Sequence, residues 1–316
     1  MTARTRRPRG VSAPRTAVLA TAVTAVLLSA LTACGGEESD GPERTYVALG
    51  DSYVAAVGIT PLAETTCSRS TRNYAQQITA ALADTPQAVR LDDQSCAGAP
   101  ISSLTETTLR GAASVPAQLD ALDDSTDLVT IGMGGNEGGI FSTLVTNCPE
   151  LRASDPTGAP CREAQQTDAG DRLVIAARGV RAAMTTALAR IHDLAPQARV
   201  FVVGYPEVAP ARGVCPRRLP LAAGDVAYFH ELTGLINDAL AAAAKAAGDT
   251  FIDAAAATRG HDICSDDPWV NGQDDGPDGS WGYHPRLQEQ QVVAGLILEE
   301  LGVTATPAAS PSPTTP

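Results

Sequence analysis

The hydrophobic and polar positions of this 316-residue chain alternate between two patterns. Five short, continuous apolar runs predict buried strands. They lie near residues 46–49, 88–91, 128–131, 200–203 and 250–253. Between them, alanine and leucine recur at helical spacing, which predicts helices. These lie around residues 73–83, 171–194, 221–247 and 285–301. Because parallel strands need helical crossovers, the alternation predicts an α/β fold, a three-layer α/β/α sandwich with a five-stranded parallel sheet.

The first 33 residues have the pattern of an export signal. Five arginines precede an apolar stretch over residues 17–31, which is shorter than the ~20 residues of a membrane-spanning helix. The run Leu31-Thr32-Ala33-Cys34 resembles a bacterial lipobox, in which the cysteine becomes diacylated and N-terminal. We therefore expect residues 1–33 to be a lipoprotein signal peptide and Cys34 to carry a lipid anchor on the outer face of the cell membrane. Secretion with a free Cys34 thiol is the alternative.

Composition divides the rest of the chain into three parts. Residues 34–44, rich in glycine and acidic residues, predict a flexible tether. Residues 45–303, a stretch of ~260 residues, are enough for one domain with a sizeable core. Residues 304–316 are Pro, Ala, Ser and Thr almost throughout, which predicts a disordered tail.

The formal net charge is -13 at pH 7, from 23 basic and 36 acidic residues. Five of the basic residues are arginines of the leader, so the mature chain is more acidic still. So negative a surface disfavours nucleic acid and anionic lipid. We therefore expect no nucleic-acid partner, a membrane link through the lipid anchor only, and a monomer.

Cysteine counting fits an exported protein. The chain has seven cysteines, and setting Cys34 aside leaves six that can form three disulfides in an oxidising compartment. Six cysteines allow 15 pairings, and neighbours along the chain are easiest to join. The expected bridges are Cys67–Cys96, Cys148–Cys161 and Cys215–Cys264, which would brace the long loops around the site.

Four short motifs carry the candidate chemistry. The first predicted strand ends at Gly50-Asp51-Ser52, and the second is followed by a turn containing Gly98. A glycine-rich turn with Asn136 follows the third, and His284 precedes the last predicted helix. In open α/β sheets, ligands bind outside the carboxyl ends of the strands, so the motifs are expected to meet there.

Serine, glycine, asparagine and histidine in this order resemble the SGNH or GDSL hydrolase family, over about residues 45–302. The similarity is greatest to the disulfide-bonded secreted esterases and lipases of that family. It implies a flavodoxin-like SGNH fold with Ser52 as nucleophile and His284 as general base. It also implies an oxyanion hole made of the Ser52 and Gly98 backbone amides and the Asn136 side chain. A serine hydroxyl needs such a base, and its tetrahedral intermediate needs such donors.

The sequence departs from the family pattern at two points. Many members have an acid three residues before the histidine, where this chain has Trp281. We expect the Trp281 backbone carbonyl to orient His284, with the carboxylate of Asp278 as the alternative. The second departure is Glu137, where the family often has aspartate, and the sequence assigns it no role.

The other histidines are expected to be structural. His192 lies near the end of a predicted helix and His230 within one, whereas His261 follows a predicted strand and is the rival base. Neither a close histidine pair nor a Cys-x-x-Cys motif occurs, so we expect no metal and no cofactor.

The resulting prediction is a serine hydrolase that cleaves carboxylic esters, either small molecules or lipids, through an acyl-enzyme intermediate. Two alternatives stay open. A carbohydrate O-deacetylase would use the same machinery on esterified glycans, and a surface binding protein would keep the fold without turnover. The sequence does not define the acyl chain or the alcohol group, because these depend on the shape of a pocket made by loops.

Overall fold

The structure, a computed structural model, describes residues 44–303. The predicted signal peptide, the Cys34 anchor, nearly all of the tether and the tail therefore lie outside the described residues.

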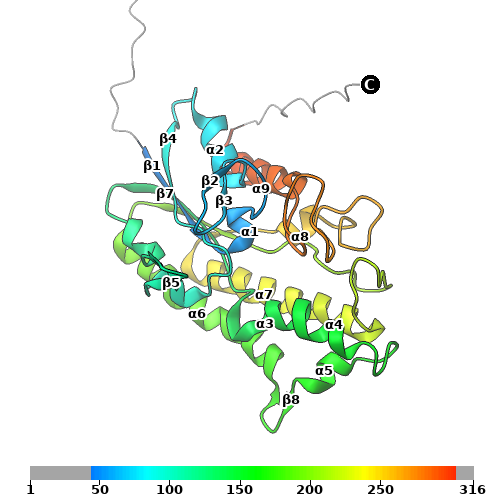
Figure 1. Cartoon of the computed structure of the whole chain (residues 1–316). Coiled ribbons are helices and arrows are strands. Elements are labelled where there is room, and N and C mark those ends of the chain that lie inside the picture. The colour runs from blue at the N-terminus through cyan, green and yellow to red at the C-terminus, as the bar shows by residue number, and fades with distance from the viewer. Residues whose placement is uncertain (1–43, 304–316) are drawn as a thin grey trace, which may run out of the picture. The chain divides into compact units, whose positions relative to one another are not determined.

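Five parallel strands form the central sheet, in the order β11-β10-β7-β1-β4 (Figure 1). Their bounds are β1 (Arg44–Gly50), β4 (Val89–Asp93), β7 (Thr126–Gly132), β10 (Arg199–Val203) and β11 (Thr250–Ile252). Each strand falls on one of the predicted apolar runs. From β1, the next strand in sequence, β4, lies on one side, and the later strands β7, β10 and β11 lie on the other. The strand order therefore reverses at β1, and such a switch point opens a crevice at the carboxyl ends of the strands.

Helices cover both faces of the sheet (Figure 1). One face carries α6 (Arg172–Leu194) and α7 (Ala223–Ala247), and the other carries α2 (Tyr74–Leu82) and α9 (Leu287–Glu300). Alternate residues of each strand enter the two cores: Val47 and Leu49 pack in the α6–α7 core, and Tyr46 and Ala48 in the α2–α9 core. Strands buried on both faces read as continuous apolar runs, which is why the sequence located them. The predicted three-layer α/β/α sandwich is confirmed.

The long helices begin and end at recognisable caps. The Asn73 side chain accepts from the Gln76 amide at the start of α2, and Asp171 accepts from the Leu173 and Val174 amides at the start of α6. At the end of α7, Gly248 takes the left-handed conformation, with φ of 84°.

Several short elements were not predicted. They include three two-stranded antiparallel hairpins, β2–β3, β5–β6 and β8–β9. Their bounds are β2 (Leu62–Glu64), β3 (Arg69–Ser70), β5 (Thr108–Arg110), β6 (Ala113–Val115), β8 (Gln166–Thr167) and β9 (Gly170–Asp171). The short helices near the site are α1 (Ser52–Ala55), η1 (Ile101–Leu104), η2 (Gln118–Ala121), η3 (Glu137–Gly139), α3 (Ile140–Ser142), η4 (Thr143–Asn147) and α8 (Ala254–Ala257).

Residues 147–168, where the sequence predicts neither a strand nor a long helix, are partly helical. It contains α4 (Cys148–Leu151) and α5 (Pro160–Ala164), joined by the Cys148–Cys161 disulfide. The Asp225 carboxylate of α7 accepts hydrogen bonds from the Cys161 and Arg162 amides, both at 3.0 Å. A cap supplied by a distant helix stabilises α5, and no local pattern predicts it.

The disulfides of the structure are the three expected pairs, Cys67–Cys96, Cys148–Cys161 and Cys215–Cys264. The first bridge ties the loop that follows α1 to the loop that follows β4, where the Ala97 amide also donates to the Cys67 carbonyl at 3.1 Å.

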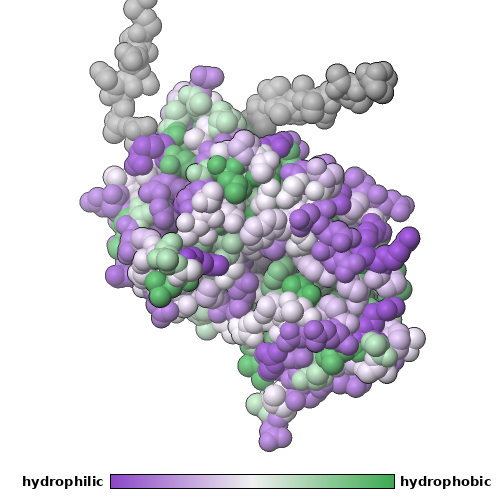
Figure 2. Space-filling view, in the orientation of Figure 1, coloured by the Kyte–Doolittle hydropathy of each residue, from purple (hydrophilic) through white to green (hydrophobic). Residues whose placement is uncertain are grey.

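Hydrophilic side chains cover most of the face drawn in Figure 2, and the hydrophobic ones form separate small patches. Within residues 44–303, no helix has the length and apolar character needed to cross a bilayer.

Candidate active site

The turn that carries Ser52 is built where β1 meets α1. Asp51 caps α1 by accepting a hydrogen bond from the Tyr53 amide at 2.9 Å, and Ser52 is the first helical residue. A Cβ on Gly50 would lie 2.2 Å from the Val54 side chain, so only glycine lets the helix fold back so closely on the strand. Ser52 is 6% exposed. Its amide begins the helix and so has no partner within it.

The loop after β4 approaches this turn. The Cys96 amide donates to the Gly50 carbonyl at 3.0 Å, which brings Gly98 toward Ser52. Gly98 has φ of 66°, a conformation that favours glycine. The buried Gln118 side chain also holds the turn, because it accepts from the Gly50 amide and donates to the Gly50 carbonyl. The sequence gave no signal for Gln118.

Asn136 reaches the same place from the loop after β7. Its Nδ2 lies 3.3 Å from the Ala99 carbonyl oxygen and 3.4 Å from Asp51 Oδ2. The structure therefore brings together the three loops that carry Ser52, Gly98 and Asn136. Glu137, to which the sequence assigned no role, accepts a hydrogen bond from the Ile101 amide at 2.6 Å and so fixes the Asn136 loop against η1.

His284 faces Ser52 directly. Its Nε2 lies 2.9 Å from Ser52 Oγ, and the residue is only 8% exposed. Aromatic rings surround the imidazole: the centroids of Tyr53, Phe141 and Trp281 lie 5.4, 5.3 and 6.3 Å from that of His284. A serine and a histidine 232 positions apart in sequence thus form a hydrogen-bonded pair in a largely dry setting.

The group that orients His284 differs from the expected one. Nδ1 lies 2.8 Å from the carbonyl oxygen of Gly282, two residues before the histidine, rather than that of Trp281. The Trp281 carbonyl instead accepts from the His284 amide and from Asn271 Nδ2. Tyr283 takes a left-handed conformation, with φ of 61°, and this tight turn places the Gly282 carbonyl beside the ring.

Asp278, the alternative orienting group, is also used elsewhere. Its carboxylate accepts from the Ser280 amide and hydroxyl and from the Leu287 amide at the start of α9. The aspartate therefore shapes the loop before His284 without touching the imidazole.

Two further residues, not foreseen from the sequence, hold the histidine loop. The buried Asn271 donates through Nδ2 to the Ser280 and Trp281 carbonyls, and its amide donates to the His284 carbonyl. The Tyr53 hydroxyl donates to the Tyr283 carbonyl at 2.8 Å, which links the nucleophile helix to the same loop.

Burial governs the protonation of the site. Desolvation lowers the pKa of His284 from 6.5 to about 4, and the Gly282 carbonyl and the negative charge of Asp275 act in the opposite direction. Burial raises the pKa of Asp51 to about 6, against hydrogen bonds from Tyr205 and the Tyr53 amide. The imidazole is therefore neutral at pH 7 and able to accept a proton.

The remaining histidines make contacts away from Ser52. His192 pairs with Asp249 at 2.9 Å, and His230 Nδ1 lies 2.9 Å from the Ala209 carbonyl oxygen. His261, the rival base, stacks on Trp269 with 3.7 Å between ring centroids. Among the described residues, no group of three or more histidine, cysteine, aspartate or glutamate side chains is arranged to hold a metal ion.

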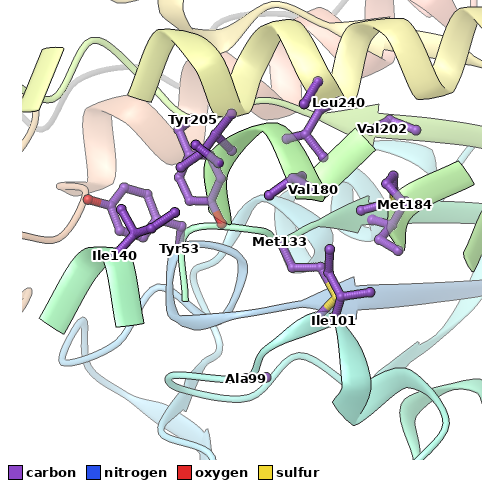
Figure 3. Close-up of a cluster of buried hydrophobic side chains, with 14 of the residues drawn as sticks. Tyr53, Ala99, Ile101, Met133, Ile140, Val180, Met184, Val202, Tyr205 and Leu240 are labelled. Atoms are coloured by element: carbon purple, nitrogen blue, oxygen red, sulfur yellow. The ribbon is translucent and has the colours of Figure 1, made fainter. Parts of the chain in front are cut away.

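A narrow apolar cavity of about 20 Å³ lies behind the aromatic rings that pack on His284. It is lined by Tyr53, Phe141 and Tyr205, with aliphatic residues from α3, η4 and α7 around them. In Figure 3 the rings of Tyr53 and Tyr205 lie side by side, with Ile140 near Tyr53. Tyr53 and Phe141 of this lining are also the rings that pack against the His284 imidazole.

A serine paired with a neutral imidazole, at the switch point of a parallel sheet and beside amides and an asparagine, is typical of serine hydrolases. Residues 48–291 match the GDSL-like Lipase/Acylhydrolase family, and the chain belongs to that family. It is thus an enzyme of the ester hydrolase class.

Individual relatives agree with the family. The chain is 38% identical to "Lipase 2" of Streptomyces coelicolor over 252 residues, which cover 78% of this chain and 82% of that protein. It is 31% identical to an esterase of Streptomyces scabiei over 250 residues, covering 69% and 72%. Among solved structures, phospholipase A1 from Streptomyces albidoflavus matches with a TM-score of 0.64 and 27% identity, over 83% of this chain and all of that one.

Proposed function

We propose that this enzyme cleaves carboxylic esters through an acyl-enzyme intermediate formed on Ser52. The observation that carries the proposal is the 2.9 Å contact between Ser52 Oγ and the Nε2 of a buried, neutral His284. A hydroxyl in this position can give its proton to the imidazole as the oxygen attacks an ester carbonyl.

The proposed reaction has two halves. In the first, His284 takes the Ser52 proton and then delivers it to the departing alcohol, leaving the acyl group on Ser52 Oγ. In the second, His284 takes a proton from water, the water oxygen attacks the acyl carbon, and Ser52 regains its hydroxyl proton as the acid leaves. The Gly282 carbonyl accepts a hydrogen bond from Nδ1–H of His284, which fixes the tautomer that leaves Nε2 free to act as the base.

The developing oxyanion would be held by the Ser52 and Gly98 amides and the Asn136 Nδ2. The Asn136 contacts in the free enzyme are long, at 3.3 and 3.4 Å, so this side chain exchanges partners at little cost when a substrate oxygen arrives. Losing one such donor typically lowers turnover by about 10²–10³.

The apolar cavity beside His284 supports an ester whose acyl group is hydrophobic. Its volume of about 20 Å³ is close to that of one water site, so only the first carbons of an acyl chain fit without movement of the lining residues. The names of the relatives, a lipase and an esterase of Streptomyces and a phospholipase A1, support the same substrate class.

For its location we propose export, followed by retention at the cell surface through a diacylated Cys34. The three disulfides support an oxidising compartment. The Leu31-Thr32-Ala33-Cys34 sequence supports the anchor.

Stoichiometric labelling with a fluorophosphonate tests the proposal. Wild type and Ser70→Ala, which lacks a buried serine hydroxyl of β3, should both incorporate one label, and Ser52→Ala none. Labelling of Ser52→Ala at the wild-type rate would contradict the proposal. A p-nitrophenyl ester panel from acetate to palmitate then defines the acyl preference, and turnover of acetate alone would favour a glycan O-deacetylase.

A further inference from the structure

Asp51 is a buried carboxylate that the proposed reaction does not use. It is 1% exposed, and its Oδ1 accepts from the Tyr53 amide as the cap of α1. Its second oxygen faces away from that cap, toward Tyr205 and Asn136. A helix cap needs only one oxygen, so the contacts of Oδ2 require a separate explanation.

Tyr205 provides the closest contact to Oδ2. It lies in the loop after β10, is 6% exposed, and donates its hydroxyl to Asp51 at 2.5 Å. The same hydroxyl oxygen accepts from the Gly135 amide at 2.7 Å. Asn237 of α7 holds the tyrosine backbone from both sides, since it accepts from the Tyr205 amide at 2.8 Å and donates to the Tyr205 carbonyl at 2.9 Å.

One hydroxyl therefore joins the loops that follow three neighbouring strands, β1, β7 and β10. Asn136 is the next residue after Gly135, and its side chain also reaches Asp51 Oδ2. Removing the hydroxyl would leave the Gly135 amide without this acceptor and Oδ2 without its strongest donor. Both changes act on the position of Asn136.

We propose that Tyr205 is a positioning residue for ester hydrolysis, which sets Asn136 at the oxyanion through the Asp51 carboxylate and the Gly135 amide. The inference rests on the proposed function, because Asn136 matters in this way only if it binds an oxyanion. Burial and the neighbouring Asp51 charge raise the pKa of Tyr205 well above 10, so the hydroxyl remains a donor throughout the working pH range.

Tyr205→Phe is the direct test, because phenylalanine keeps the ring that lines the cavity and removes only the hydroxyl. We expect kcat on a p-nitrophenyl ester to fall about 10- to 100-fold, with KM within twofold of wild type. The matched control is Tyr228→Phe. Tyr228 is also a buried tyrosine that donates to a carboxylate, that of Asp171 at 2.7 Å, but at the start of α6. This control should lose stability and keep its kcat.

A double-mutant cycle with Asn136→Ala separates positioning from a general structural effect. If Tyr205 acts through Asn136, Tyr205→Phe should lower kcat by less than about threefold once the asparagine is gone. An equal loss in both backgrounds, or a change in wild-type kcat below twofold, would overturn the positioning role. If Asn136→Ala alone keeps wild-type turnover, the oxyanion part of the proposed function fails instead, and this inference with it. If Tyr205→Phe folds poorly, Asp51→Asn, which keeps the size of the side chain, tests the same hydrogen-bond network.

Discussion

In the proposed mechanism, His284 acts as a base at neutral pH without a carboxylate on its Nδ1. The imidazole is buried among aromatic rings, and Nδ1 rests on a backbone carbonyl. Desolvation keeps it neutral, and the 2.9 Å contact keeps Nε2 on the serine. In the proposed mechanism, donors that stabilise the oxyanion offset the weaker stabilisation of imidazolium.

The pH profile follows from the lowered pKa of His284. A protonated imidazole cannot take the serine proton, so kcat/KM should fall only as the pH approaches about 4, rather than 6.5. The contribution of His284 to native stability should also decline as the pH drops from 6.5 toward 4, because there the unfolded chain protonates this histidine and the native site does not. If kcat/KM also changes near pH 6, and this change is absent in Asp51→Asn, it belongs to the titration of Asp51. A single fall in kcat/KM near pH 6.5 that Asp51→Asn leaves unchanged would contradict the lowered pKa of His284.

Asp278→Asn should leave catalysis nearly intact. The carboxylate supports Ser280 and the start of α9, so its loss should lower the melting temperature and change kcat by less than about tenfold. The matched variant is Asp275→Asn. The charge of Asp275 raises the pKa of His284, so its loss should move the fall in kcat/KM at acid pH to a lower pH. A loss beyond a hundredfold in Asp278→Asn, with unchanged melting temperature, would make Asp278 the orienting acid.

The residues with direct chemical roles could be proposed from the sequence, and those that position them could not. Ser52, Gly98, Asn136 and His284 stand in short motifs whose composition is unusual. Gln118, Asn271 and Tyr205 act through hydrogen bonds to residues outside their own local segments, which leave no local pattern. The choice of Gly282 over Trp281 depended on one left-handed residue, Tyr283.

At the scale of elements, the central sheet and long helices were predictable because burial imposes a period on the sequence. Strands buried on both faces are continuous apolar runs, and α6 and α7 repeat alanine and leucine at helical spacing. The short helices α4 and α5 are held by the Cys148–Cys161 disulfide and by a distant cap, Asp225, on α5. Their sequences are too short to carry a period.

Two disulfides offer a comparison between elements near and far from the site. Cys67→Ser/Cys96→Ser removes the bridge beside the Gly98 loop, and Cys148→Ser/Cys161→Ser removes the one between α4 and α5. The bridges join cysteines 29 and 13 positions apart in sequence. Loss of either bridge should destabilise the fold by about 3 kcal/mol, and loss of the longer loop's bridge should cost slightly more. Only the first should also lower kcat, measured at a temperature where both variants are folded. Equal kcat losses would show that the Cys67–Cys96 bridge has no special link to the oxyanion loop.

At the scale of the whole molecule, the proposed membrane attachment rests on the acidic character of the chain and the lipobox-like sequence together. A chain with a net charge of -13 is not drawn to anionic lipids, so the proposed attachment would depend on Cys34. Wild type should therefore partition with membranes, and Cys34→Ala should appear in the culture medium. Equal solubility of both after cell fractionation would mean that no anchor exists.

Turnover of one p-nitrophenyl ester by Ser52→Ala and His284→Ala tests the central claim most directly. Because a nucleophile and its base act as a unit, each substitution should lower kcat by several orders of magnitude while the fold remains intact. His261→Ala, the rival histidine on a distant loop, should stay within twofold of wild type. If either Ser52→Ala or His284→Ala retains more than about a tenth of the wild-type kcat, the claim that this pair hydrolyses esters is wrong.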